Sequence, residues 1–158
     1  MNPVDTILAE LSRGVDPETA IALLRRLATD PDKQRRMVSM LKAHPPEAAR
    51  LVLVRSLAFT GAPPALFYAV LRTDPSADVR EEAAWSLMHV TEDGNVAELK
   101  TILAGTFDKQ VCRVIEEVIE VVLDDLEAER AADDKHAEVN MKRRASDGAK
   151  RLSVKEGA

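Results

Sequence analysis

The residue types that most often carry catalysis are few in this chain of 158 residues. It has three histidines, His44, His89 and His136, and one cysteine, Cys112, all far apart in the sequence. None of them stands in a spacing that is typical of a zinc protease or a serine hydrolase, and the chain has no glycine-rich nucleotide-binding motif. Catalysis needs a nucleophile, a base or metal ligands held close together. The sequence therefore predicts a protein that is not an enzyme and that holds no metal or other cofactor.

Composition bounds the fold class and the compartment. The chain is 46% hydrophobic, 31% charged and 3% aromatic, with a formal net charge of −5. This apolar fraction suits one folded domain, and the chain has no run of eighteen apolar residues that would span a membrane. One cysteine excludes an internal disulfide, and the first residues lack the pattern of a signal peptide. We therefore expect a cytoplasmic protein.

The elements that must position any functional side chain are helices. Ala, Leu, Arg and Glu dominate the stretches between the eight prolines, all of which lie in the first 75 residues. Proline is tolerated in the first turn of a helix and not in its interior, so these prolines mark helix starts or breaks. The segment Asp16-Pro17-Glu18 is typical of a capped start. The sequence predicts eight helices, over residues 3–13, 17–29, 32–43, 46–60, 63–73, 77–91, 95–104 and 108–130.

Apolar residues recur with a period of about thirty residues. Leucines near the ends of the odd-numbered helices are separated by 30, 30 and 32 residues: Leu11, Leu41, Leu71 and Leu103. Two columns in the even-numbered helices repeat these steps: Leu27, Leu57, Leu87 and Ile119, and Leu23, Leu53, Ala83 and Ile115. One helix pair cannot bury its apolar face alone, whereas stacked pairs bury a continuous core. We therefore expect a solenoid of four helix–turn–helix units over residues 1–130.

The stretch from Leu71 to Leu87 resembles a HEAT-like repeat. In that family a first helix ends in leucine, an Asp-Pro turn follows, and a second helix opens with Asp-Val-Arg before Ala-Ala and Leu. The chain has Asp74-Pro75, Asp78-Val79-Arg80 and Ala83-Ala84 at these places. The resemblance implies an all-α fold, a right-handed α-α superhelix, and says little about activity. It also implies that Arg50 and Arg80 brace adjacent units through an acid or a carbonyl.

The second helices of HEAT-like solenoids line the concave face, which usually binds the partner. On the corresponding face this chain carries Arg25, Arg55, Phe59, Trp85, His89 and Glu117. Arginine and aromatic side chains dominate interface energetics. The resemblance therefore implies an adaptor or regulatory subunit that binds another protein through this row. The alternative is that Trp85 only fills a gap between helices and that Arg25 and Arg55 are solvated surface residues.

Charge is distributed unevenly along the chain. The net charge is +2 over residues 1–60, −4 over 61–107, −5 over 108–131 and +2 over 132–158. The last predicted helix has one apolar face, which is typical of a capping helix, and its acidic residues would suit a basic partner segment. Residues 131–158 carry few large apolar side chains, so they cannot support a core. We expect these residues to form a charged, disordered tail.

Other functions stay open beside protein binding. The basic first units, or the tail cluster Lys142-Arg143-Arg144, would suit nucleic acid or an anionic membrane, although the net acidity argues against nucleic acid as the main partner. A small HEAT-like chain would also serve as an accessory subunit of an enzyme such as a lyase. HEAT-like hydroxylases bind iron through His-Glu pairs, and this chain has no His-Glu dipeptide. The helix over 46–60 is apolar nearly all round, which favours a homo-oligomer or a partner contact at Leu51 and Val52.

Overall fold

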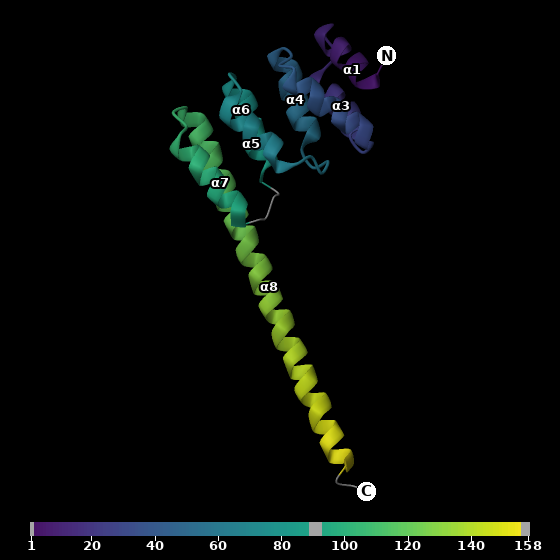
Figure 1. The fold of residues 1–158 in the computed structure, drawn as a ribbon, viewed down its shortest axis with the longest axis vertical. Coiled ribbons are helices and arrows are strands. Elements are labelled where there is room, and N and C mark those ends of the chain that lie inside the picture. The colour runs from purple at the N-terminus through teal and green to yellow at the C-terminus, as the bar shows by residue number, and fades with distance from the viewer. Residues whose placement is uncertain (1, 89–92, 156–158) are drawn as a thin grey trace. The chain divides into compact units, whose positions relative to one another are not determined.

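The computed structural model describes the backbone of residues 2–88 and 93–155 and the side chains of residues 2–88 and 94–146. All regular secondary structure in these ranges is α-helical, and the helices follow one another along the chain with short connections (Figure 1). They are α1 (Pro3–Ser12), α2 (Pro17–Leu27), α3 (Pro31–Lys42), α4 (Glu47–Leu57), α5 (Pro64–Thr73), α6 (Ala77–Ser86), α7 (Asp93–Ala104) and α8 (Lys109–Lys155). Over the described residues, the predicted number and order of the helices are confirmed.

Capping side chains explain where the first three helices begin. Asn2, Asp16 and Asp30 each precede a proline in the first helical position. Their side-chain oxygens accept hydrogen bonds from first-turn backbone N–H groups at 3.0, 2.9 and 2.8 Å, respectively. These bonds satisfy donors that have no partner inside the helix, and the proline removes one such donor outright. The prediction that these prolines mark helix starts is therefore confirmed.

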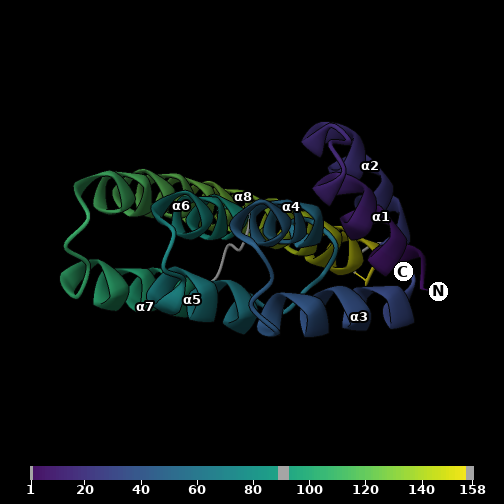
Figure 2. The same cartoon turned by 90° about the horizontal axis from the view of Figure 1, so that it is seen from above.

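Within Met1–Val122 the helices form two rows (Figure 2). α3, α5 and α7 lie along one row, and α4 and α6 lie along the other. α4 packs against α2, α3 and α6, and α5 packs against α6. Both rows contribute fully buried aliphatic side chains to the core, such as Met37 and Leu99 from the first row and Leu53 and Leu57 from the second. Their burial supplies the main favourable free energy of folding.

The first helix pair departs from the predicted apolar columns. Leu53, Ala83 and Ile115 are fully buried, whereas Leu23 in the same column is 43% exposed. α2 instead buries Ala20, Ile21 and Leu24. Leu24, Val54 and Ala84 keep the thirty-residue step and are fully buried in all three helices, so the first unit differs in the neighbouring column rather than in its whole register.

α4 ends three residues earlier than predicted. Ala58 leaves the helical region with a ψ of 138°, and Phe59 follows with a φ of +64°. The helix therefore stops at Leu57, although Ala58, Phe59 and Thr60 extend the apolar pattern on which the prediction rested.

Val52 is only 2% exposed, so the suggested partner contact at this residue is wrong.

The chain divides into two compact units, Met1–Val122 and Leu123–Ala158. Instead of the disordered tail expected after residue 130, α8 continues as a helix to Lys155. Alanine and charged residues of high helix propensity fill this segment, and Lys142 Nζ lies 2.6 Å from Glu138 Oε1 one turn away. As expected for residues that build no core, every side chain from 127 to 146 is exposed. Across the described ranges, α8 included, no helix is long and apolar enough to cross a membrane.

A chain that ends at Arg130 is expected to be as stable as the full chain. The side chains described beyond this residue are all exposed, so the free energy of unfolding should change by less than about 0.5 kcal/mol. Urea denaturation followed by circular dichroism measures it. A control chain that ends at Glu120 also loses the fully buried Val122 and should be less stable. Equal losses in both truncated chains would contradict the prediction.

Candidate functional site

A cavity of about 390 Å³ lies where α2, α4 and α6 adjoin. It is lined by Glu18, Arg25, Arg55, Ala58, Phe59, Glu82, Trp85, Ser86 and Met88. We call it the α2–α4–α6 groove. Four of the six side chains singled out in the sequence line it, namely Arg25, Arg55, Phe59 and Trp85. Residues that are 60 positions apart in the chain thus meet at one surface.

The groove is built on packed helices rather than on loops alone. α4 packs against α2 on one side and against α6 on the other, so it fixes the spacing between the groove walls. Val52, Leu53 and Val54 of α4 are buried and anchor the helix in the core. A site carried by packed helices is preorganised, which lowers the entropy cost of binding.

Trp85 is half-buried in α6. Its side chain lines the α2–α4–α6 groove and also a second cavity of about 520 Å³, which Glu81, Lys109, Gln110, Arg113, Val114 and Glu117 complete. Core tryptophans are seldom fully enclosed, so partial burial by itself does not assign a role to this residue. Its place in the lining of both cavities is what makes it accessible to a ligand there.

Arg55 lies between two carboxylates. Its Nη1 is 2.8 Å from Glu18 Oε1 of α2, and its Nε is 3.1 Å from Glu82 Oε1 of α6. The hydrogen bond to Glu82 and the negative charges of Glu82 and Glu18 raise the pKa of the guanidinium above its ordinary value. Arg55 therefore ties three helices together, and its positive charge is compensated within the protein.

Arg25 is exposed and is held in a different way. Its Nη2 donates a 3.1 Å hydrogen bond to the backbone carbonyl oxygen of Arg55, near the end of α4. Among the described side chains no carboxylate lies within 4.0 Å of its guanidinium. A carbonyl orients a guanidinium but carries no net charge, so Arg25 is left without a directly paired carboxylate among the described side chains.

Phe59 combines an exposed ring with an unfavourable backbone. The residue is 68% exposed, and its φ of +64° lies in the left-handed region. For a residue with a Cβ this conformation costs about 1–2 kcal/mol relative to the right-handed one. Glycine would avoid that cost. The exposed ring of Phe59 lines the groove, so a ligand bound there would contact it.

Replacement of Phe59 by glycine is expected to leave the protein at least as stable as Phe59→Ala, and more stable by about 1 kcal/mol. Both variants lose the same ring, but only alanine keeps the strained φ, so their difference isolates the backbone cost. Chemical denaturation of the two variants and the parent measures it. Equal stability of the glycine and alanine variants would show that the position carries no strain.

Glu117 and His89 are the predicted site residues that the groove does not include. Glu117 lines the second cavity beside Trp85, and its carboxylate lies 3.0 Å from Arg113 Nε one turn earlier in α8. His89 falls outside the described residues. The predicted row therefore divides into a group of four at the groove and one acidic residue at the neighbouring cavity.

Two groove residues with strong effects on charge, Glu18 and Glu82, were not among the predicted ones. Glu82 precedes Trp85 by three positions on α6, and Glu18 precedes Arg25 by seven positions on α2. Residues at these spacings share a helix face. The helix faces that hold Arg25 and Trp85 therefore also hold these two glutamates. They were missed because the predicted row was chosen from residue types that are enriched in interfaces, and glutamate is depleted there.

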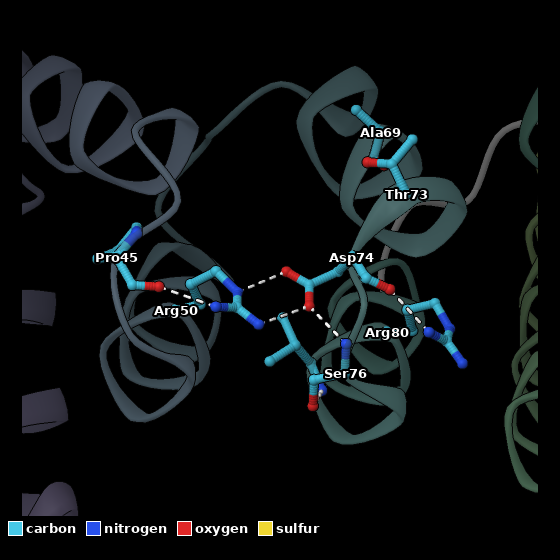
Figure 3. A network of polar contacts seen from close by, with 8 residues as sticks. Pro45, Arg50, Ala69, Thr73, Asp74, Ser76 and Arg80 are labelled. Carbon is cyan, nitrogen blue, oxygen red and sulfur yellow. Dashed lines mark hydrogen bonds and ion pairs between the residues drawn. The ribbon is translucent and has the colours of Figure 1, made fainter.

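A buried ion pair joins α4 to the turn between α5 and α6 (Figure 3). Arg50 Nε donates to Asp74 Oδ2 at 2.8 Å, and Nη2 donates to Asp74 Oδ1 at 3.0 Å. Arg50 Nη1 donates to the carbonyl of Pro45 at 2.8 Å, and the backbone N–H of Ser76 donates to Asp74 Oδ1 at 2.9 Å. Arg50 is 9% exposed and Asp74 5%. This bidentate geometry, with two parallel N–H···O hydrogen bonds, is the strong form of an arginine–carboxylate contact.

Arg80 extends the same network to α8. Its Nη1 donates to the backbone carbonyl of Asp74 at 2.7 Å, and its Nη2 lies 3.6 Å from Asp108 Oδ2 (Figure 3 shows the first contact). Asp108 directly precedes α8 and also accepts hydrogen bonds from Gln110 and Val111 N–H groups. The expectation that Arg50 and Arg80 brace adjacent helix pairs through an acid or a carbonyl is confirmed.

Neither Cys112 nor His44 lines the groove. Cys112 is half-buried, and its Sγ lies 3.2 Å from the carbonyl oxygen of Thr106. His44 is exposed at the end of α3 and has a φ of +51°. Within the described part of the chain, no group of three or more His, Cys, Asp or Glu side chains is placed to hold a metal ion.

A scan against models of protein families, a search of curated proteins and a search of solved structures found no match to this chain.

Proposed function

We propose that this chain is a HEAT-like solenoid of four helix pairs that binds another protein through the α2–α4–α6 groove, as an adaptor or a regulatory subunit. The observation that carries the proposal is that Arg25, Arg55, Phe59 and Trp85 line one cavity. Tryptophan and arginine are enriched among the residues that dominate binding energy. A half-buried tryptophan beside an exposed phenylalanine offers a partner an anchor on a preformed surface.

The spacing of polar contacts supports stacked thirty-residue units. Several contacts join helices two places apart in the chain: Asp5 with Arg36, Arg55 with Glu82, Arg72 with Glu98, and Glu81 with Gln110. The paired residues are 31, 27, 26 and 29 positions apart. Contacts at nearly one repeat length are what neighbouring units of a solenoid make, because each unit touches only the next.

The charge balance of the groove favours a protein partner over nucleic acid. Two arginines and two glutamates line it, so its formal charge is zero. Nucleic-acid surfaces instead gather uncompensated lysine and arginine, which pair with phosphates and give binding a steep dependence on salt. The apolar atoms of Ala58, Phe59, Trp85 and Met88 fit the centre of a protein interface better.

Affinity purification from the native host, with three baits, tests the proposal. The baits are the parent chain, Trp85→Ala and Phe107→Ala. Phe107 is the matched control because it is 96% exposed and lines a separate cavity beside Arg72 and Asp108. We expect one partner to co-purify with the parent and with Phe107→Ala but not with Trp85→Ala. Equal recovery with all three baits would remove the groove as the binding site.

A further inference from the structure

We propose that the α2–α4–α6 groove takes a peptide segment of the partner in which a large apolar side chain stands next to a carboxylate. The inference rests on the proposed function and adds the chemistry of the segment. Two features of the groove carry it: an apolar wall formed by Phe59, Trp85 and Met88, and the guanidinium of Arg25, which pairs directly with no carboxylate among the described side chains.

The apolar wall defines the first half of the segment. Phe59 is 68% exposed, while Trp85 and Met88 are half-buried. These side chains and Ala58 line one cavity of about 390 Å³, which lies in the usual range for ligand pockets. Aromatic rings and the thioether of methionine gain most from contact with another apolar or aromatic side chain. The groove therefore suits Leu, Met, Phe or Trp as the anchor.

The charges of the groove define the second half. Arg55 is already paired with Glu18 and Glu82, and these three side chains together have a formal charge of −1, so they do not attract a carboxylate of a partner. Arg25 has one hydrogen bond, to the carbonyl of Arg55, and a guanidinium has five N–H donors. A carboxylate beside Arg25 would form an ion pair with its guanidinium and accept hydrogen bonds from the remaining N–H groups.

The same charges also set the direction of the segment. Glu82 on α6 and Glu18 in the first turn of α2 would each repel a carboxylate placed beside them, whereas Arg25 lies in the last turn of α2, seven residues beyond Glu18. The anchor is therefore expected to lie against Phe59 and Trp85 and the carboxylate to point toward Arg25 at the end of α2. Because Arg25 and Trp85 line one cavity, a segment of a few residues is long enough to reach both.

Selection from a displayed library of random twelve-residue peptides tests the inference without knowledge of the partner. The library is selected against the parent chain, Arg25→Gln and Trp85→Ala. We expect peptides enriched on the parent to share a large apolar residue with Asp or Glu within two or three positions. Arg25→Gln should keep the apolar preference and lose the acidic one, and Trp85→Ala should lose both. Circular dichroism checks that each variant is folded.

A matched peptide pair makes the test quantitative. The best parent-selected peptide is compared with its counterpart in which the acidic residue is changed to the amide. The acidic peptide is expected to bind the parent about tenfold more tightly, because a hydrogen bond between charged groups is lost in the amide. On Arg25→Gln the two peptides should bind equally. Such a cycle isolates the pair formed by Arg25 and the carboxylate.

The outcomes separate this inference from the proposed function. Enriched peptides that need Trp85 but show no acidic preference would overturn the inference and leave protein binding at the groove intact. Failure of any peptide to bind the parent more tightly than Trp85→Ala would overturn both. A parent dimer in sedimentation that Trp85→Ala abolishes would assign the groove to a second copy of this chain, which also overturns the inference.

Discussion

Replacement of Arg50 by alanine is expected to lower the free energy of unfolding by about 3–5 kcal/mol. Arg50 and Asp74 are 9% and 5% exposed and form two hydrogen bonds with each other. Removal of the guanidinium leaves the carboxylate of Asp74 in a buried place, with only the N–H of Ser76 as a described donor. The carbonyl of Pro45 loses a 2.8 Å hydrogen bond as well. Urea denaturation followed by circular dichroism measures the loss.

An exposed ion pair of the same type is the matched control. Arg72 pairs with Glu98 between α5 and α7, and both side chains are more than one third exposed. Exposed pairs contribute about 0–1 kcal/mol because water and salt screen them. Arg72→Ala should therefore cost far less than Arg50→Ala. Similar losses at the two positions would show that burial does not set the strength of the brace.

A double replacement separates the pair from its surroundings. In Arg50→Met with Asp74→Leu both charges are absent, so no carboxylate is left without a partner. Buried ion pairs replaced by apolar residues of similar volume are often neutral or stabilising. We expect the double variant to regain most of the stability lost in Arg50→Ala. The brace would then act mainly by fixing how α4 meets the turn between α5 and α6.

Helix starts were predictable because they are encoded locally. Asp16 and Asp30 each lie directly before a proline, and the cap involves residues within three positions. The end of α4 was not predictable in the same way. The residues around Phe59 continue an apolar helical pattern, and nothing in their types requires the left-handed φ that ends the helix. Phe59 nevertheless reaches the predicted surface, from the turn rather than from the helix.

The composition of the groove was predictable in part. A helical period and a repeat length are enough to place Arg25, Arg55 and Trp85 on one face. The pairing of Arg55 with Glu18 and Glu82 depends on contacts between residues 37 and 27 positions apart. Such contacts follow from how helices pack, which propensity and periodicity do not specify. Of the two arginines in the predicted row, Arg55 therefore pairs with two carboxylates and Arg25 with a backbone carbonyl.

Trp85→Ala is expected to weaken binding of the partner identified by affinity purification by about 30-fold, which corresponds to roughly 2 kcal/mol. Tryptophan loses more contact area on truncation than any other residue, and Trp85 lines the groove beside Phe59 and Met88. Isothermal titration calorimetry with the purified partner measures the change. Because Trp85 is half-buried, the variant's thermal unfolding is measured too, and binding is compared only where both proteins are folded.

Phe59→Gly keeps this prediction testable if Trp85→Ala proves unstable. It removes the second aromatic ring of the groove and relieves a strained backbone, and its thermal unfolding is measured as well, so weaker binding of a folded variant is attributed to the lost ring. Since Phe59 and Trp85 line the same cavity, the losses in the double variant should not add. A coupling between the two positions would mean that one partner side chain contacts both rings. Binding within twofold of the parent in both single variants would exclude the groove as the site.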